Sequence, residues 1–434
     1  MKSRKMLAVV ALVGAIMLVA AACGEDEGGG GGAATPPQAG ELGAITLKAG
    51  EPMKFASIQA ISGDTASLGT DQVTGLQVAI DDLGGKLLGH DIQLTSLDDG
   101  CAAAAGTTAA QRVAADKQIV GVIGTSCSGA AVPAMEILSE AGFTMISGSN
   151  TSPILTSAGG VEGSAHKPGY FRTAHNDAIQ GRAAATFVYQ NLGITKAATI
   201  NDGDPYTQGL TAGFEAPFKE FGGEIVVSTA INKGDTDMKP VLTEIAAAGA
   251  EIIFFPIFQP EGDHVVRQAK DIAGLENTVL MGADGLLSDT YMVIPEVHDT
   301  PPGAKGTVRG MYFSGPNPPA GSAYTDFLAK YKAKAGTDPI QAFHAHAYDA
   351  LMVMVEAIKK VAVTLADGSL FIDRQKLRDA VAATKDYAGI TGPISCDQFG
   401  DCANPRISVF QATPDHKDLA AVKTNVLYTL EPGQ

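Results

Sequence analysis

Tryptophan is absent from this chain of 434 residues, and phenylalanine and tyrosine bring the aromatic share to only 6%. Charged residues make up only 18%, and no run of Lys or Arg follows Lys5. Phosphate backbones are bound by clustered Lys and Arg, so this scarcity, with a formal charge of −16, argues against nucleic acid as a partner. The 45% hydrophobic share is enough to bury two ordinary cores.

Signatures of catalysis and of cofactor binding are missing as well. The turn Gly124–Gly129 contains serines and a cysteine but is not a nucleophile elbow, and no phosphate-binding loop or dinucleotide fingerprint stands out. His344 and His346 would face apart on a helix, which makes them a poor metal pair. Asp202 and Asp204 lack the glutamate spacing of a calcium loop and are interpreted as a turn. We therefore expect no catalytic residue, cofactor or metal.

The amino terminus has the pattern of an export signal. Three basic residues, Lys2, Arg4 and Lys5, precede the apolar run Met6–Val19, which is short for a membrane span. Small residues then lead to Cys23, and this ending resembles a bacterial lipobox, which implies lipidation of Cys23. We expect residues 1–22 to be a signal peptide and the mature chain to be a lipoprotein anchored at the cell surface or in the periplasm.

A glycine-rich segment follows the signal. Residues 23–44 include the run Gly28–Gly32 among acids, alanines and prolines, a composition that buries too little apolar area to fold. We expect a flexible tether. Removing the three basic residues of the leader leaves 28 Lys and Arg against 47 Asp and Glu, a charge of −19.

Four cysteines remain after Cys23, and an even number in an exported chain indicates disulfides. Three pairings are possible. We favour Cys101 with Cys127 and Cys396 with Cys402, because the second pair would close a short turn. No Cys-x-x-Cys spacing supports a zinc site instead.

The segment Gly121–Leu155 organises the rest of the chain. An apolar strand over 119–123 and a short strand over 143–146 flank an amphipathic helix, and each strand ends in a turn rich in Ser, Thr and Gly. Consecutive strands of a parallel sheet place such turns at the same carboxyl-terminal edge, where ligands bind. Hydroxyls and free N–H groups at a helix start suit a carboxylate, so we expect these turns to hold that of a free amino acid.

Strand–helix alternation occurs twice, which predicts an α/β protein of two doubly wound, Rossmann-like lobes. We expect residues 45–173 and 314–405 to form lobe 1, and residues 174–313 and 406–434 to form lobe 2. A hinge near Thr173 and the return strands would join them, with the ligand in the cleft between.

Short matching pieces are spread from Ile45 to the end of the chain. They are Ile61-Ser62-Gly63, Asp99-x-Cys101, Gly124-x-x-Cys127-Ser128, Met145-Ile146-Ser147, Thr151-x-Pro153, Phe171-Arg172-Thr173, Pro260-Glu261, Arg267-Gln268-Ala269 and Met281-Gly282-x-Asp284-Gly285. In this order and spacing the chain resembles the periplasmic leucine/isoleucine/valine-binding proteins, which are receptors of ABC importers with the type I periplasmic-binding fold.

The resemblance implies a ligand site. The positions that hold the ligand carboxylate in that family are Ser128 and Thr151 here, with the backbone at Ser126 and Asn150 nearby, and the acid that pairs with the ammonium is Asp284. The side-chain pocket would contain Leu68, Tyr206 and Phe258. Asp284 replaces a frequent Glu, Leu68 replaces an aromatic residue and Phe258 replaces a frequent Tyr. The family's disulfide near the site supports the pair Cys101–Cys127.

By this resemblance we expect a monomeric receptor that captures a branched-chain or other apolar amino acid and passes it to an ABC permease. Alternatives are an amino-acid or amide sensor without transport, and a secreted enzyme on the same fold. Ser128 and Thr151 could instead only cap helices. Asp284 could be a turn acid, and Tyr206 and Phe258 could belong to the core.

Overall fold

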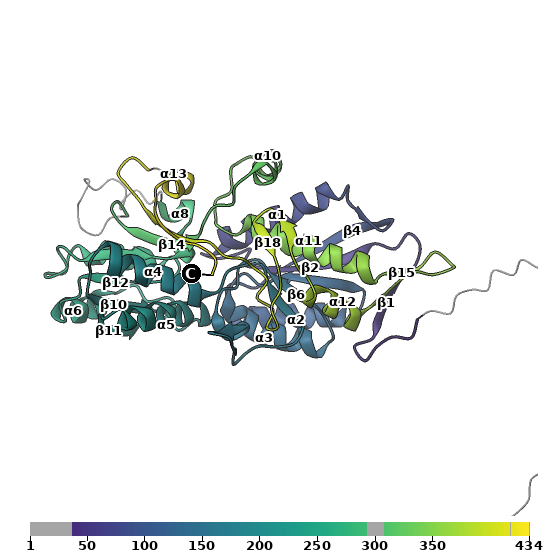
Figure 1. Cartoon of the computed structure of the whole chain (residues 1–434), viewed down its shortest axis with the longest axis horizontal. Coiled ribbons are helices and arrows are strands. Elements are labelled where there is room, and N and C mark those ends of the chain that lie inside the picture. Colours follow the sequence, from purple (N-terminus) through teal and green to yellow (C-terminus); the bar gives the residue numbers. More distant parts are fainter. Residues whose placement is uncertain (1–36, 293–307, 417, 434) are drawn as a thin grey trace, which may run out of the picture.

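Two sheets lie end to end along the long axis of an elongated molecule (Figure 1). The computed structural model describes residues 37–292, 308–416 and 418–433. The expected signal peptide, Cys23 and most of the tether lie outside the described residues. No helix within the described ranges is long and apolar enough to cross a membrane.

The first sheet has six strands in the order β3-β4-β2-β5-β6-β9 and is parallel apart from β3. Its strands are β2 (Met53–Gln59), β3 (Lys86–Leu87), β4 (His90–Asp98), β5 (Ile119–Gly124), β6 (Met145–Ser147) and β9 (Tyr170–Arg172). Its helices are α1 (Ala66–Asp82), α2 (Ala103–Ala115), α3 (Ser128–Glu140), α10 (Ser322–Ala335), α11 (His344–Val361) and α12 (Arg374–Ala382).

Both faces of this sheet are buried, as a parallel sheet requires. Along β5, Val122 packs among residues of α2 and α3, whereas the next residue, Ile123, packs among residues of α1 and α11. Side chains alternate between the faces of a strand, so one apolar run serves both helical layers. This arrangement is the doubly wound lobe expected from the sequence.

The second sheet has seven strands in the order β11-β10-β12-β13-β14-β19-β20. The first five are parallel, and β19 and β20 add antiparallel strands at one edge. The strands are β10 (Lys196–Asn201), β11 (Glu224–Ala230), β12 (Ile252–Phe254), β13 (Val279–Gly282), β14 (Tyr312–Pro316), β19 (Ile407–Gln411) and β20 (Val426–Leu430). The helices are α4 (Asp177–Thr186), the π-helical η2 (Phe187–Asn191), α5 (Pro205–Glu220), α6 (Lys239–Ala247), α7 (Glu261–Ala269), the 3-10 helix η3 (Asp284–Leu286), α8 (Asp289–Met292) and α13 (Leu419–Thr424).

Small elements complete the described chain. β1 (Ala44–Leu47) pairs antiparallel with β16 (Leu370–Asp373), which also pairs with β15 (Val363–Thr364). Two hairpins, β7 (Ser157–Ala158) with β8 (Val161–Glu162) and β17 (Tyr387–Gly389) with β18 (Gly392–Ile394), and the 3-10 helix η1 (Pro153–Leu155) are the others.

The expected tether, residues 23–44, extends a few residues into the folded part of the chain. The backbone N–H of Gly40 donates to the Asp373 carboxylate at 2.6 Å, and β1 begins at Ala44. The chain is therefore attached to the folded body before residue 44.

Three segments pass between the two sheets. The chain crosses from β9 to α4 over 173–176, from β14 to α10 over 317–321, and from the loop after β18 to β19 over 395–406. The expected lobe boundary at residue 314 falls inside β14, which continues to Pro316 as a strand of the second sheet.

Candidate ligand-binding site

One cleft is lined by loops from both sheets, at the carboxyl ends of their parallel strands. The space between its atoms measures about 470 Å³, part of it open to solvent. The lobe built on the first sheet contributes Asp64, Thr65, Ser67, Leu68, Ser126, Cys127, Ser128, Ser149, Gln341 and Phe343. The lobe built on the second sheet contributes Tyr206, Phe258, Gln259, Asp284 and Gly285.

Ser128 is the first residue of α3 and lines the cleft. The preceding Cys127 is extended and makes no side-chain cap, and its carbonyl accepts from the N–H groups of Ala130 and Ala131 at 3.1 Å. The N–H groups of Ser128 and Gly129 come before these bonds and so have no intrahelical partner. The Ser128 Oγ accepts a hydrogen bond from the backbone N–H of Ser152 at 3.3 Å. A hydroxyl beside a 13-residue helix start makes a favourable place for a carboxylate.

The structure contradicts two of the expected carboxylate donors. The backbone N–H of Ser126 already donates to Asp99 at 2.6 Å, and that of Asn150 donates to the Ser147 Oγ at 2.9 Å. The Ser126 hydroxyl lies between Gln59 and Gln72. Each of these groups already has a hydrogen-bond partner within the protein. Their hydrogen bonds therefore stabilise the turns around the cleft.

Thr151 is buried but does not line the cleft. Its carbonyl accepts from the backbone N–H of Asp177 at 2.9 Å, and its hydroxyl faces the Asp177 carboxylate. Ser149, two residues earlier, lines the cleft instead. The turn over residues 147–152 therefore reaches the cleft through Ser149, and Thr151 as a ligand contact stays a prediction.

Asp284 lies on the opposite wall, at the start of η3. Its Oδ1 accepts from Gln180 Nε2 at 2.6 Å and from the Tyr206 hydroxyl at 3.1 Å. Burial raises the pKa of Asp284 to about 6, against the opposing effect of these hydrogen bonds. A pKa of about 6 leaves the group mostly ionised above that pH, and a buried ionised acid favours a cationic partner.

A second buried acid lies beside the first. Burial, followed by repulsion from Asp284, raises the pKa of Asp177 well above its usual value. Asp177 and Gln180 are three residues apart on α4 and so share a helix face. The raised pKa of Asp177 favours its neutral form, so Asp284, which lines the cleft, is the acid available to an ammonium group.

The three expected pocket residues all line the cleft. Leu68 comes from the start of α1, and the rings of Tyr206 and Phe258 lie 5.1 Å apart in a tilted pair. Sequence reasoning missed Phe343, whose ring stacks on His175 at 6.0 Å. Its only signal was an aromatic residue immediately before the apolar helix α11.

Residues considered and rejected as metal ligands have structural partners. Asp204 caps α5 by accepting from the Tyr206 N–H, and Asp202 accepts from the Thr207 hydroxyl. His344 lies between Asp71 and the Tyr324 hydroxyl. Over residues 37–292, 308–416 and 418–433, no group of three His, Cys, Asp or Glu residues is arranged to hold a metal.

Both favoured disulfides are formed. Cys101–Cys127 joins the turn after β4 to the residue that precedes α3, so it fixes the start of that helix beside the cleft. Cys396–Cys402 closes a short loop next to β9.

Known proteins share this architecture. The chain is 29% identical to the Leu/Ile/Val-binding protein BraC3 of Rhizobium johnstonii over 82% of this chain and 90% of that protein. A branched-chain amino acid transporter substrate-binding protein of Streptococcus pneumoniae, solved with isoleucine, superposes with a TM-score of 0.70 at 22% identity, covering 88% of this chain and 100% of the other. An ABC-transporter solute-binding protein of R. palustris in complex with benzoate gives 0.69 at 21% identity, covering 88% and 97%.

The family described as periplasmic binding protein matches residues 52–416, which include the first sheet, every strand of the second sheet except β20, and every cleft residue named above. Relatives named in these comparisons are substrate-binding proteins of transporters and not enzymes. The secreted-enzyme alternative is thereby set aside. The chain belongs to the periplasmic binding protein family, a family of exported solute receptors with the two-lobed type I fold.

Proposed function

We propose that this chain is an extracytoplasmic receptor that holds one amino acid with an apolar side chain between its lobes and delivers it to an ABC importer. Relatives named for leucine, isoleucine and valine, and the fold neighbour that holds isoleucine, support this class of ligand. The observation that carries the proposal is the pairing of an ionised acid and an anion-binding helix start across one cleft.

The electrostatic argument concerns the cost of burying a zwitterion. A charged group taken from water costs several kcal/mol unless it is paired and hydrogen-bonded. Ser128 and the start of α3 offer hydrogen-bond donors to the carboxylate, and Asp284 offers a charge to the ammonium. Because the two groups come from different lobes, an amino acid that satisfies both would hold the lobes together.

The third part of the site is apolar. Leu68, Tyr206, Phe258 and Phe343 would cover the ligand side chain, and burial of a Leu-sized side chain contributes about 1.5–3 kcal/mol. Asp284 is one methylene shorter than Glu, so we propose that a water can lie between it and the ammonium.

The remaining parts of the proposal concern the whole receptor. We propose a lipid on Cys23, a tether that spaces the receptor from the membrane, and a monomer whose lobes close around the three crossing segments. Delivery to a permease distinguishes this receptor from a sensor without transport. Uptake of the bound amino acid by cells that carry the intact gene, and its loss on deletion, would support transport.

An aromatic carboxylate is the second candidate. Fold neighbours titled as complexes with benzoate, 3,4-dihydroxybenzoic acid and 4-hydroxybenzoate favour it, as do the three aromatic rings that line the cleft. Asp284 argues for the amino acid instead, because a benzoate has no cation to offset this buried acid.

A thermal-shift screen of the soluble chain, lacking residues 1–36, tests the proposal. We expect a rise in Tm with leucine, isoleucine or valine and none with the three benzoates. A shift with benzoates alone would contradict the amino-acid proposal and favour the second candidate.

A further inference from the structure

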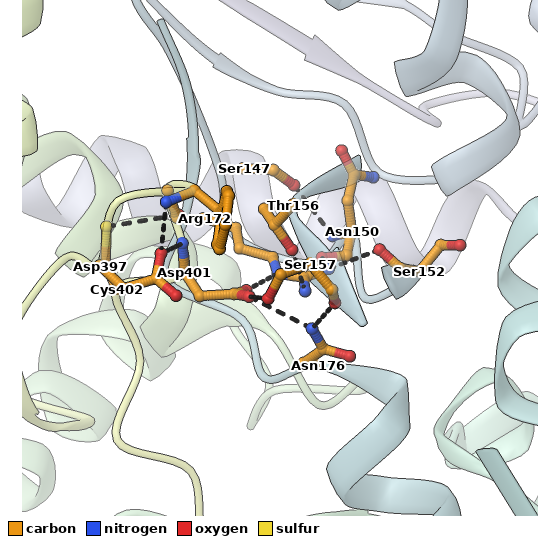
Figure 2. Close-up of polar contacts among 12 residues, drawn as sticks. Ser147, Asn150, Ser152, Thr156, Ser157, Arg172, Asn176, Asp397, Asp401 and Cys402 are labelled. Atoms are coloured by element: carbon orange, nitrogen blue, oxygen red, sulfur yellow. Dashed lines mark hydrogen bonds and ion pairs between the residues drawn. The ribbon is translucent and has the colours of Figure 1, made fainter. Parts of the chain in front are cut away.

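The side chain of Arg172 is completely buried behind the cleft, at the end of β9 (Figure 2). Its Nε donates to the Asp401 Oδ1, and Asp401 is itself only 20% exposed. Burial opposes the charge of Arg172, and Asp401 more than offsets this, so the pKa of Arg172 is raised. The pair therefore keeps a charge inside the protein.

The other nitrogens of Arg172 hold the turn that follows β6. One terminal nitrogen donates to the carbonyls of Asn150 and Ser152, at 3.2 and 2.9 Å, and the other donates to the Thr156 Oγ1 at 2.6 Å. The N–H of Ser152 in turn donates to the Ser128 Oγ. Arg172 thus fixes the carbonyls of the residues before and after Thr151 and, through the N–H of Ser152, the hydroxyl proposed to bind the ligand carboxylate.

The second oxygen of Asp401, Oδ2, accepts hydrogen bonds on the side of the start of α4. It accepts from Asn176 Nδ2 at 3.2 Å and from the Ser157 Oγ at 3.4 Å. The Oδ1 of Asn176 caps α4 by accepting from the N–H of Ala178 at 2.9 Å. One turn further along α4, Gln180 donates to Asp284.

Asp401 is itself fixed by its loop. The disulfide Cys396–Cys402 closes the loop, and Asp397 accepts from the backbone N–H of Asp401 at 3.0 Å. Two backbone hydrogen bonds attach the loop to β9, from the Arg172 N–H to the Gly400 carbonyl and from the Cys402 N–H to the Arg172 carbonyl. The carboxylate is therefore presented by a constrained loop rather than by a mobile one.

From these contacts we propose that Asp401 is a positioning residue shared by both lobes: one of its oxygens orients the carboxylate-binding turn through Arg172, and the other orients the start of α4 through Asn176. The inference rests on the proposed function, since it assigns the two ends of the same ligand. Removing the charge of Asp401 leaves a buried guanidinium without its counterion, which is costly and loosens the turn it holds.

The variant Asp401→Asn tests this proposal, with Ser157→Ala as the matched control because Ser157 touches Asp401 but not Arg172. The first readout needs no ligand: hydrogen exchange of the peptide covering residues 150–156. We expect Asp401→Asn to speed exchange there about tenfold or more and Ser157→Ala to change it less than twofold.

The second readout is calorimetric affinity for the best ligand of the thermal-shift screen and for its carboxamide. We expect at least a tenfold loss for the carboxylate form and a smaller loss for the carboxamide, so that discrimination between them narrows. Unchanged exchange at 150–156, or an equal loss for both ligands, would overturn the proposal.

If Asp401→Asn does not fold, Asp401→Glu keeps the charge and misplaces the oxygens, and the same two criteria apply to it. Failure of the wild-type chain to bind any amino acid would contradict the proposed function alone, because the exchange readout remains.

Discussion

Asp284 and Ser128 lie on opposite walls of the cleft and would divide the two charges of an amino acid between them. Replacing Asp284 by Asn keeps the size of the side chain and removes its charge. We predict a loss of amino-acid affinity of about 30–100-fold, because a charge-assisted hydrogen bond in a buried site is worth about 2–3 kcal/mol. Isothermal titration calorimetry measures this change.

Asp64→Asn is the control, since Asp64 also lines the cleft but is exposed, and exposed charges contribute little. It should change affinity less than threefold. Equal affinities of Asp284→Asn and the wild-type protein would remove Asp284 as the ammonium partner.

Titration of Asp284 makes binding depend on pH. Its pKa is raised to about 6, so at pH 5 only about one-tenth of the group is ionised and at pH 7 about nine-tenths. We predict that affinity weakens about tenfold from pH 7 to pH 5 and that Asp284→Asn flattens this profile. A wild-type profile that is flat, or that strengthens toward pH 5, would contradict the assignment.

Stability should depend on pH with a sign that follows from the same pKa. The folded chain holds this proton up to about pH 6, whereas the unfolded chain releases it near 3.8. The contribution of Asp284 to stability therefore falls as pH rises from about 4 to about 6 and is constant above. Denaturant unfolding of the ligand-free wild-type and Asp284→Asn proteins across this window checks the sign.

The removal of two hydroxyls tests the opposite wall. We predict that Ser128→Ala weakens binding about tenfold, because Ser128 lines the cleft, and that Thr151→Ala acts less because Thr151 faces Asp177. Calorimetry of the two single variants and of the double variant gives the ranking. A larger loss with Thr151→Ala would show that ligand binding brings Thr151 into the cleft.

Single residues show how far the sequence predicts the site. Position in a matched piece pointed to Ser128 and Asp284, and the wider resemblance pointed to Leu68, Tyr206 and Phe258; all five line the cleft. The donors at Ser126 and Asn150 were wrong because nothing in their local sequence reveals that Asp99 and Ser147 use their N–H groups. No role was predicted for Arg172 beyond its place in a matched piece, because its partner Asp401 lies 229 residues further along the chain.

At the scale of elements, the disulfide Cys101–Cys127 connects the loops that precede α2 and α3. Replacing both cysteines by Ala should lower the free energy of unfolding by about 3–4 kcal/mol, from the chain entropy of a 26-residue separation. The same change at Cys396 and Cys402, separated by 6 residues, should cost about 2 kcal/mol. Urea unfolding without reductant compares them, and a larger loss at the second pair would contradict the loop-length argument.

Elements with strong apolar runs were predicted closely, whereas short or polar ones were missed. The expected strand over 119–123 agrees with β5 to within one residue, whereas the one over 143–146 overlaps β6 (Met145–Ser147) only in part. The helix α7 buries Val265, Val266 and Ala269 at helical spacing, but its nine residues are fewer than the roughly 11 to 18 over which such a period is read. β20 was not expected, because four of its five residues are exposed or only partly buried and its alternation is therefore weak.

For the whole molecule, one contact links the lobes at the mouth of the cleft. Lys233 Nζ donates to the Asp204 carboxylate at 2.9 Å, within the second lobe. It also donates to the Cys101 carbonyl of the first lobe at 3.4 Å. The Lys233 side chain is 42% exposed, so its contribution is small. We predict that Lys233→Met speeds ligand release two- to fivefold without changing discrimination between an acid and its carboxamide.

Lys219→Met is the control, because Lys219 pairs with Glu215 on the same helix. Stopped-flow release rates measure both variants. A rate change for Lys219→Met as large as that for Lys233→Met would show that the link between lobes is not its cause.

The two-lobed organisation could be predicted from strand–helix alternation, since each crossover has its own apolar strand and amphipathic helix. The points of crossing could not be placed to the residue. β14 leaves the alternation and pairs antiparallel with β19, a partner 91 or more residues away, so its end at Pro316 depends on tertiary pairing. Local sequence carries no signal for such a partner.

The most direct test of the account compares three ligands by calorimetry: leucine, its carboxamide, and the same acid without the amino group. The account predicts tight binding of leucine alone, with a loss of at least about thirtyfold when either charged group is missing. Binding of the deaminated acid as tight as that of leucine would contradict the claim that one cleft pairs both charges of an amino acid.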